Sequence, residues 1–235
     1  MPITPDGFAK RIDRLRSDLV AQAGRAVAAV DAAVVATFAR DSAAGAAVVE
    51  ADKEIDRRGV DIERASVQLL EDATREGAAL TAEQLRTVLI VVKVNNELER
   101  IADAGAAVGE MASTGQIPAV PPATFRVMAN SVIGILESSV RAFERMDTRG
   151  ALVVLASDEA VVAFKEILLR EAQEQIAAGR QTVDMAFALH AMASQLERIA
   201  DHCTNIAEQV IYFATGSIVR HTGGRWTEPE PASSA

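Results

Sequence analysis

The stretch Leu98-Glu99-Arg100-Ile101-Ala102-Asp103 recurs without change at residues 196–201. Each copy lies near the end of one half of the 235-residue chain, which predicts an internal duplication. A Glu and an Asp four residues apart lie on one face of a helix, about one turn from each other. Two carboxylates so placed repel each other unless a cationic group lies near them. The presence of this pair in both halves suggests that it is used.

The composition favours a helical, soluble protein. Hydrophobic residues make up 49% of the chain, aromatic residues only 4%, and there are 7 prolines, which suits long helices packed through small side chains. The net charge of −9 and the absence of a basic cluster argue against a nucleic-acid partner. The single cysteine favours a reducing cytosol. Because neither a signal peptide nor an apolar run of about 20 residues is apparent, we expect a cytoplasmic protein with no membrane span.

Five breaks in the helical pattern divide the chain into six predicted helices. They lie at residues 40–42, 76–77, 113–118, 147–150 and 178–180. The strongest is the Gly- and Pro-containing stretch 113–122, where we place the boundary between two halves. Thr81, followed three residues later by Gln84, is predicted to begin the third helix with a capping box.

We therefore predict an all-α fold in which six helices form two tandem three-helix bundles related by an internal pseudo-twofold. The first repeat is expected over residues 1–116 and the second over residues 117–221. Residues 222–235 have a loop composition and are expected to form a flexible C-terminal tail.

A second pair of carboxylates, Asp52 and Asp56, lies four residues apart on the second predicted helix. If that helix packs antiparallel against the third, both would converge with Glu99 and Asp103. Four carboxylates in one place require a bound cation, and oxygen ligands favour iron, manganese, magnesium or calcium. The alternative is an acidic, solvated face on which nearby arginines form weak surface ion pairs. Those arginines are Arg57, Arg58, Arg100 and Arg198.

The histidines and the cysteine offer little catalytic chemistry. His190 lies seven residues before Glu197 on roughly the same helix face, so it could join a site there, although a partly buried, hydrogen-bonded histidine is the simpler interpretation. Neither His202 nor His221 has the spacing of a zinc ligand. Cys203 has no base partner evident in the sequence, and no phosphate-binding or nucleophile motif is present. We expect no catalytic nucleophile.

Residues 195–221, QLERIADHCTNIAEQVIYFATGSIVRH, resemble the closing helix of the PhoU family, which comprises bacterial regulators of phosphate uptake. ADKEID at residues 51–56 and LTAEQLRTVLIVVKVNNELERIADAGAAVGE at residues 80–110 are similar to the family's second and third helices. The resemblance covers roughly residues 8–221. It implies a protein without catalytic chemistry that represses the phosphate-starvation response and restrains the high-affinity phosphate transporter.

The resemblance also implies partners and a metal site. The partners are the transporter's ATPase subunit and a membrane sensor histidine kinase, which would recruit a cytoplasmic protein to the inner face of the membrane; a homodimer is also expected. The implied cofactor is a multinuclear cluster of iron, zinc, manganese or magnesium on the carboxylate motifs. Carried over to this chain, the first site comprises Asp52, Asp56, Glu99 and Asp103, with Glu110 one and a half to two turns further on. The second comprises Glu197, Asp201, Asn205 and Glu208.

The chain departs from the family pattern at two positions. Ala107 stands where the first half should match Asn205, and Val162, four residues after Asp158, stands where the second half should repeat Asp56. Because loss of an anionic ligand weakens a site for a hard cation, we expect metal binding to be stronger in the first half.

Two other functions remain open from the residues. A carboxylate-bridged metalloenzyme or metal-storage bundle would need an open coordination position and, for catalysis, a substrate pocket. A generic helical adaptor without metal would instead have its carboxylates splayed apart in solvent.

Overall fold

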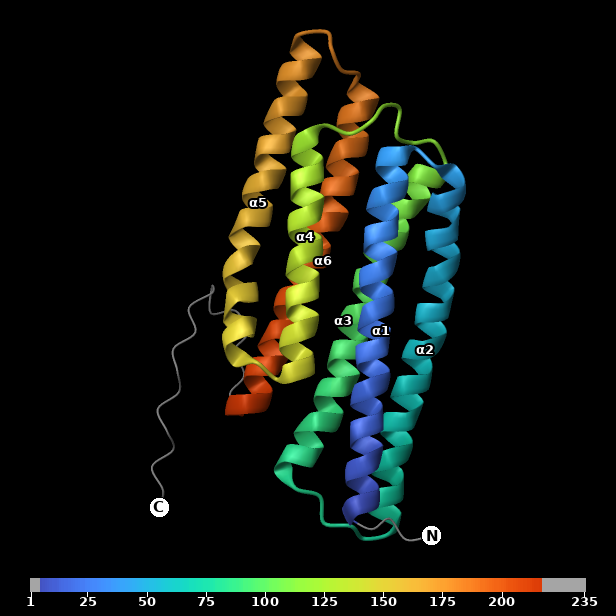
Figure 1. Ribbon diagram of the computed structural model, residues 1–235, viewed down its shortest axis with the longest axis vertical. Helices are drawn as coiled ribbons and strands as arrows, with labels where there is room; N and C mark the ends of the chain where they lie inside the picture. The colour runs from blue at the N-terminus through green and yellow to red at the C-terminus, as the bar shows by residue number, and fades with distance from the viewer. Residues whose placement is uncertain (1–4, 217–235) are drawn as a thin grey trace.

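Six long helices make up the computed structural model, which describes residues 5–216 (Figure 1). They are α1 (Pro5–Ala39), α2 (Ser42–Arg75), α3 (Ala82–Ser113), α4 (Ala123–Arg145), α5 (Thr148–Ala177) and α6 (Val183–Thr215). No strand occurs in this described range. The all-α prediction is confirmed, and the predicted breaks fall at the links between the helices. The predicted tail 222–235 and the last residues of the second repeat, 217–221, lie outside the described residues.

Side-chain caps explain where several helices begin. The Thr81 hydroxyl accepts a hydrogen bond from the backbone N–H of Gln84, whose side chain accepts one from the backbone N–H of Thr81. This is the capping box predicted from the sequence. Asp41, Asp147 and Thr182 accept backbone hydrogen bonds at the starts of α2, α5 and α6. Each cap satisfies N–H groups that have no partner within the helix.

Each half of the chain forms a three-helix bundle, α1–α3 and α4–α6, and the two bundles lie side by side (Figure 1). Within the described residues, α2 contacts only α1 and α3, and α5 contacts only α4 and α6. The bundles meet where α3 packs against α6 and where α1 packs against α4. Thus α2 and α5 are the outer helices, while α3 and α6 form the centre of the molecule.

The first helix is unusually apolar. The segment Gly7–Ala39 is the one described stretch that is long and apolar enough to cross a membrane by length and composition alone. Half of its most apolar window is buried inside the protein, and Leu19, Ala26 and Ala36 have no exposed surface. Since α1 packs against α2, α3 and α4, these residues belong to the shared hydrophobic core.

Glycines allow α2 and α3 to pack closely. A Cβ atom on Gly45 would lie 2.5 Å from the carbonyl oxygen of Gly109, and one on Gly109 would lie 3.0 Å from Cβ of Val48. Contact this close tolerates no side chain and therefore fixes how far α2 can slide along α3. Asp52, about two turns after Gly45, and Asp103, about two turns before Gly109, are consequently held at the same level.

Candidate metal centre

The packing of α2 against α3 brings together the first predicted set of ligands. We call Asp52, Asp56, Glu99 and Asp103 the first-repeat cluster. One carboxylate oxygen from each of the three aspartates lies within 4.8 Å of the other two. Metal–oxygen distances of about 2.0–2.6 Å allow ligands of one ion to lie up to about 5 Å apart, so these oxygens can share a cation. Glu99 lies outside this closest group, but its charge still acts on Asp52.

The carboxylates of this cluster are held in an unfavourable environment. Burial, followed by the charges of Asp56, Asp103 and Glu99, raises the pKa of Asp52 from 3.8 to about 6. Burial and the charges of Asp56 and Asp103 also raise the pKa of Glu99. Moreover, Oδ1 of Asp52 is buried and has no hydrogen-bond partner. A bound cation would supply that partner and oppose both pKa shifts, so the donor set fits a hard divalent metal ion.

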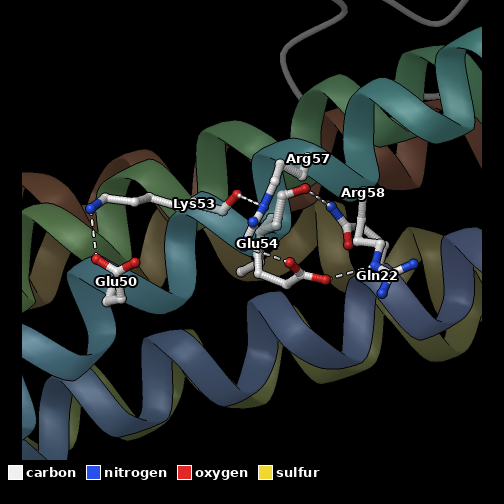
Figure 2. A network of polar contacts seen from close by, with 7 residues as sticks. Gln22, Glu50, Lys53, Glu54, Arg57 and Arg58 are labelled. Carbon is white, nitrogen blue, oxygen red and sulfur yellow. Dashed lines mark hydrogen bonds and ion pairs between the residues drawn. The ribbon is translucent and has the colours of Figure 1, made fainter.

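The arginines of α2 do not neutralise the first-repeat cluster. Arg57 and Arg58 each approach the carboxylate of Glu54 to 2.8 Å, as Figure 2 shows. Glu54 is two residues from Asp52 along the helix and thus points about 200° away from it. No lysine or arginine of the described residues forms an ion pair with any member of the cluster. The surface pairs considered from the sequence do form on α2, but on another face.

The second repeat has a different arrangement. Glu197, the equivalent of Glu99, pairs with Lys165 of α5, and the Nζ–Oε2 distance is 2.5 Å. The lysine side chain is 19% exposed and that of the glutamate 26%. Val162 replaces the carboxylate of Asp56 with an exposed apolar side chain. Among residues whose side chains the structure describes, a set that excludes Asp158, this repeat has no group of three metal-ligating side chains.

Two residues of α6 contact the first repeat instead. Asn205, a predicted ligand of the second site, donates its amide hydrogen to Oε2 of Glu97 at 3.0 Å, and Nδ1 of His202 lies 2.7 Å from the same oxygen. Burial would raise the pKa of Glu97, but the hydrogen bonds from His202 and Asn205 outweigh it and hold that pKa below its usual value. The sequence reasoning did not identify Glu97. The sequence offers one indication of it: the residue before the hexapeptide is the charged Glu97 in the first half and the neutral Gln195 in the second.

The remaining predicted ligands of the second site are Asp201, which is exposed, and Glu208, which is half-buried. His190 is exposed on α6, so the interpretation of a partly buried histidine was wrong; the residue lies on the outward face of the helix. His221 lies outside the described residues. Cys203 is fully buried, and burial raises the pKa of its thiol to about 12, which keeps it protonated at neutral pH.

Comparisons with known proteins match the architecture and its two repeats. The family model for the PhoU domain matches residues 11–112 and 125–210, one match in each predicted repeat. The curated phosphate-specific transport system accessory protein PhoU of Serratia marcescens is 27% identical over 219 residues, which span 92% of this chain and 88% of that protein.

Two crystal structures are similar over almost the whole described fold. PhoU from Streptococcus pneumoniae superposes with a TM-score of 0.81 at 20% identity, covering 90% of this chain and 99% of that one. PhoU from Pseudomonas aeruginosa superposes with a TM-score of 0.80 at 28% identity, covering 89% and 100%. Because the PhoU domain model matches both halves of the chain and the six-helix fold is shared with these structures, this chain belongs to the PhoU family.

Proposed function

We propose that this chain is a negative regulator of phosphate uptake and of the phosphate-starvation response. It acts by binding the ATPase subunit of a phosphate transporter and a membrane sensor histidine kinase, and it catalyses no reaction. The observation that carries the proposal is the extent of similarity, because the match to an accessory protein of phosphate transport spans 92% of this chain and 88% of the relative. A cytoplasmic protein recruited to the inner face of the membrane by these partners fits that role.

The geometry of the acidic cluster supports binding rather than turnover. Asp56 and Asp103 are exposed at the seam between α2 and α3. A groove of about 480 Å³ lies elsewhere, between α1 and α2, and its lining includes Arg14 and Arg25 but no member of the cluster. A metalloenzyme needs a substrate pocket beside its metal, so this separation counts against the metalloenzyme alternative.

The first repeat, on the same proposal, binds one or more divalent cations that stabilise the contact between α2 and α3. The buried, unpartnered Oδ1 of Asp52 supports this over a splayed, solvated acidic face. Metal content after dialysis of the purified protein tests it. Asp103→Ala should remove more metal than the matched variant Asp201→Ala. Equal loss from both variants, or no metal in the unmodified protein, would overturn this part of the proposal.

The regulatory role is tested in the host strain after deletion of the gene. The deletion should derepress phosphate-starvation genes in rich phosphate, and the unmodified chain should restore repression. A folded Glu99→Ala/Asp103→Ala variant should restore it at least partly, because contact surface rather than a reaction centre carries the signal. If this variant is as inactive as the deletion, the metal site itself is the functional centre.

Direct partner binding requires a second experiment. The tagged chain is cross-linked in cells grown in high or low phosphate, and the captured proteins are identified by mass spectrometry. The transporter ATPase and the sensor kinase should be enriched over a mock-tagged control in high phosphate. Their absence from a capture of a functional tagged chain would refute the binding mechanism.

A further inference from the structure

In the second repeat a lysine forms an ion pair with Glu197, whereas no described lysine or arginine forms an ion pair with Glu99 in the first repeat. The hexapeptide copies lie 98 residues apart, which makes Glu197 the equivalent of Glu99. Burial and the negative charges of Asp56, Asp103 and Glu63 raise the pKa of Glu99 and outweigh the opposing charge of Arg100. Glu197 is instead bound by the ammonium group of Lys165, with both side chains largely buried.

The position of Lys165 on α5 explains how it reaches Glu197. Val162, three residues earlier on the same helix face, stands where the first repeat has Asp56. Side chains on a helix lean toward its N-terminus and cover the preceding turn. By this rule the long stem of Lys165 reaches back toward the turn of Val162, and its ammonium group contacts Glu197, the equivalent of the Glu99 on which Asp56 acts in the first repeat.

A pair of substitutions between the repeats fits this placement. The alignment of α2 with α5 that pairs Asp56 with Val162 has an offset of 106 residues, and it makes Gly59, which has no side chain, the equivalent of Lys165. Asn95 of α3 lies beside that glycine: its Nδ2 donates to the carbonyl of Gly59 at 3.2 Å and lies 3.4 Å from where a Cβ would be. The residue equivalent to Asn95 is Ala193. The first repeat thus combines Gly59 with the amide of Asn95, and the second combines Lys165 with Ala193.

We propose that Lys165 is the built-in cation of the second repeat and that it excludes metal from Glu197. Its ammonium group neutralises the glutamate permanently, without a dissociable ion, so only the first repeat responds to metal. The inference rests on the proposed metal binding by the first repeat. The inference concerns Lys165 of α5 and Glu197 of α6, to which the proposed function assigns no metal.

The test measures Mn²⁺ binding by equilibrium dialysis of the full-length chain. Asp52→Asn/Asp103→Asn silences the first repeat, and we expect this variant to bind no Mn²⁺. Adding Val162→Asp/Lys165→Ala removes the ammonium group and restores the missing carboxylate, which should create binding of at least one ion per chain. Adding Glu197→Gln should abolish the new site. Helix content and the unfolding midpoint are compared among all variants.

The reciprocal exchange uses the first repeat of the otherwise unmodified chain. Gly59→Lys/Asn95→Ala transplants the second-repeat pair and should weaken Mn²⁺ binding at least tenfold. Asn95→Ala alone is the matched control and should bind normally. A folded exchange variant that binds Mn²⁺ as tightly as this control would overturn the proposal.

The outcomes separate the two proposals. If the silenced protein binds an ion that Glu197→Gln removes, metal coexists with Lys165 and the inference is wrong. It is also wrong if Val162→Asp/Lys165→Ala creates no site in a folded protein. If the unmodified chain binds no Mn²⁺ but this double change creates a site, the role of Lys165 is supported and the proposed first-repeat site fails.

Discussion

Replacing Asp52 with Asn should stabilise the metal-free protein at neutral pH. The pKa of Asp52 rises from 3.8 to about 6 because of burial and the charges of Asp56, Asp103 and Glu99. Below about pH 4 this carboxyl is protonated in both the folded and the unfolded chain, so its ionisation costs nothing. Between about pH 4 and pH 6 the unfolded chain releases this proton while the folded protein retains it, so the free energy of unfolding falls over this interval and stays lower above it.

The size of the effect follows from the same pKa. A rise from 3.8 to about 6 corresponds to about 3 kcal/mol if the carboxyl is shielded from water. Asp52 is only half-buried, so solvent reduces both the cost of burying its charge and the repulsion from its neighbours, and we expect about 1 to 1.5 kcal/mol of stabilisation above pH 7. Near pH 4 most of this difference between variant and unmodified protein should disappear.

Urea unfolding of the chelator-treated protein at pH 4 and pH 7.5 measures this difference. Comparing the two pH values cancels any packing effect of the asparagine that does not depend on protonation. Saturating Mn²⁺ should then reverse the order at pH 7.5, because a ligand at 100 times its Kd adds about 2.7 kcal/mol to the protein that binds it. The same free-energy difference at both pH values would refute the electrostatic reasoning.

Three further variants test the packing and the contact between repeats. Gly45→Ala should lower the free energy of unfolding by about 2 kcal/mol, because its Cβ would lie 2.5 Å from the Gly109 oxygen. Gly24→Ala, with no atom within 4 Å of its Cβ, should stabilise α1 by about 0.5 kcal/mol. Urea midpoints that shift equally for the two variants would contradict this. Glu97→Gln should cost about 1 to 2 kcal/mol at pH 7. This loss should shrink as the pH falls through the lowered pKa of Glu97, and a loss independent of pH would count against the charged hydrogen bonds to His202 and Asn205.

Local signals were enough to predict the helices and the repeat. The capping box at Thr81 and the breaks near Gly77 and Gly115 depend only on neighbouring residues, and each lies where the structure ends or begins a helix. The convergence of Asp52 and Asp103 could also be expected, because two helices joined by a short link pack antiparallel. The hydrophobic periodicity and the breaks between helices were therefore enough to predict the fold and the convergence of the first-repeat cluster.

Long-range pairings were not predictable in the same way. Lys165 and Glu197 are 32 residues apart, and Glu97 and His202 are 105 apart, so neither pair forms a local motif. Their partners depend on the rotation of each helix about its axis, which periodicity determines only roughly. Alignment of α5 with α2 places Lys165 against Gly59 and could have indicated a cation in the second repeat. The carboxylate pair of the hexapeptide, taken by itself, predicts a metal site in both repeats.

The location of the hexapeptide gives a second reason why it occurs twice. The hydrogen bond between Glu97 and His202 shows which turn of α3 lies against which turn of α6. Equivalent residues of α3 and α6 lie 98 apart, so the α3 equivalent of His202 is Ala104. The midpoint between Glu97 and Ala104 falls between residues 100 and 101, so the pseudo-twofold axis passes through the repeated stretch. Its apolar residues are fully buried in both copies, namely Leu98, Ile101, Ala102, Leu196, Ile199 and Ala200. Packing across the pseudo-twofold thus favours the same sequence on both helices, while α2 and α5 remain free to differ. Identical carboxylates can therefore face aspartates in one repeat and a lysine in the other.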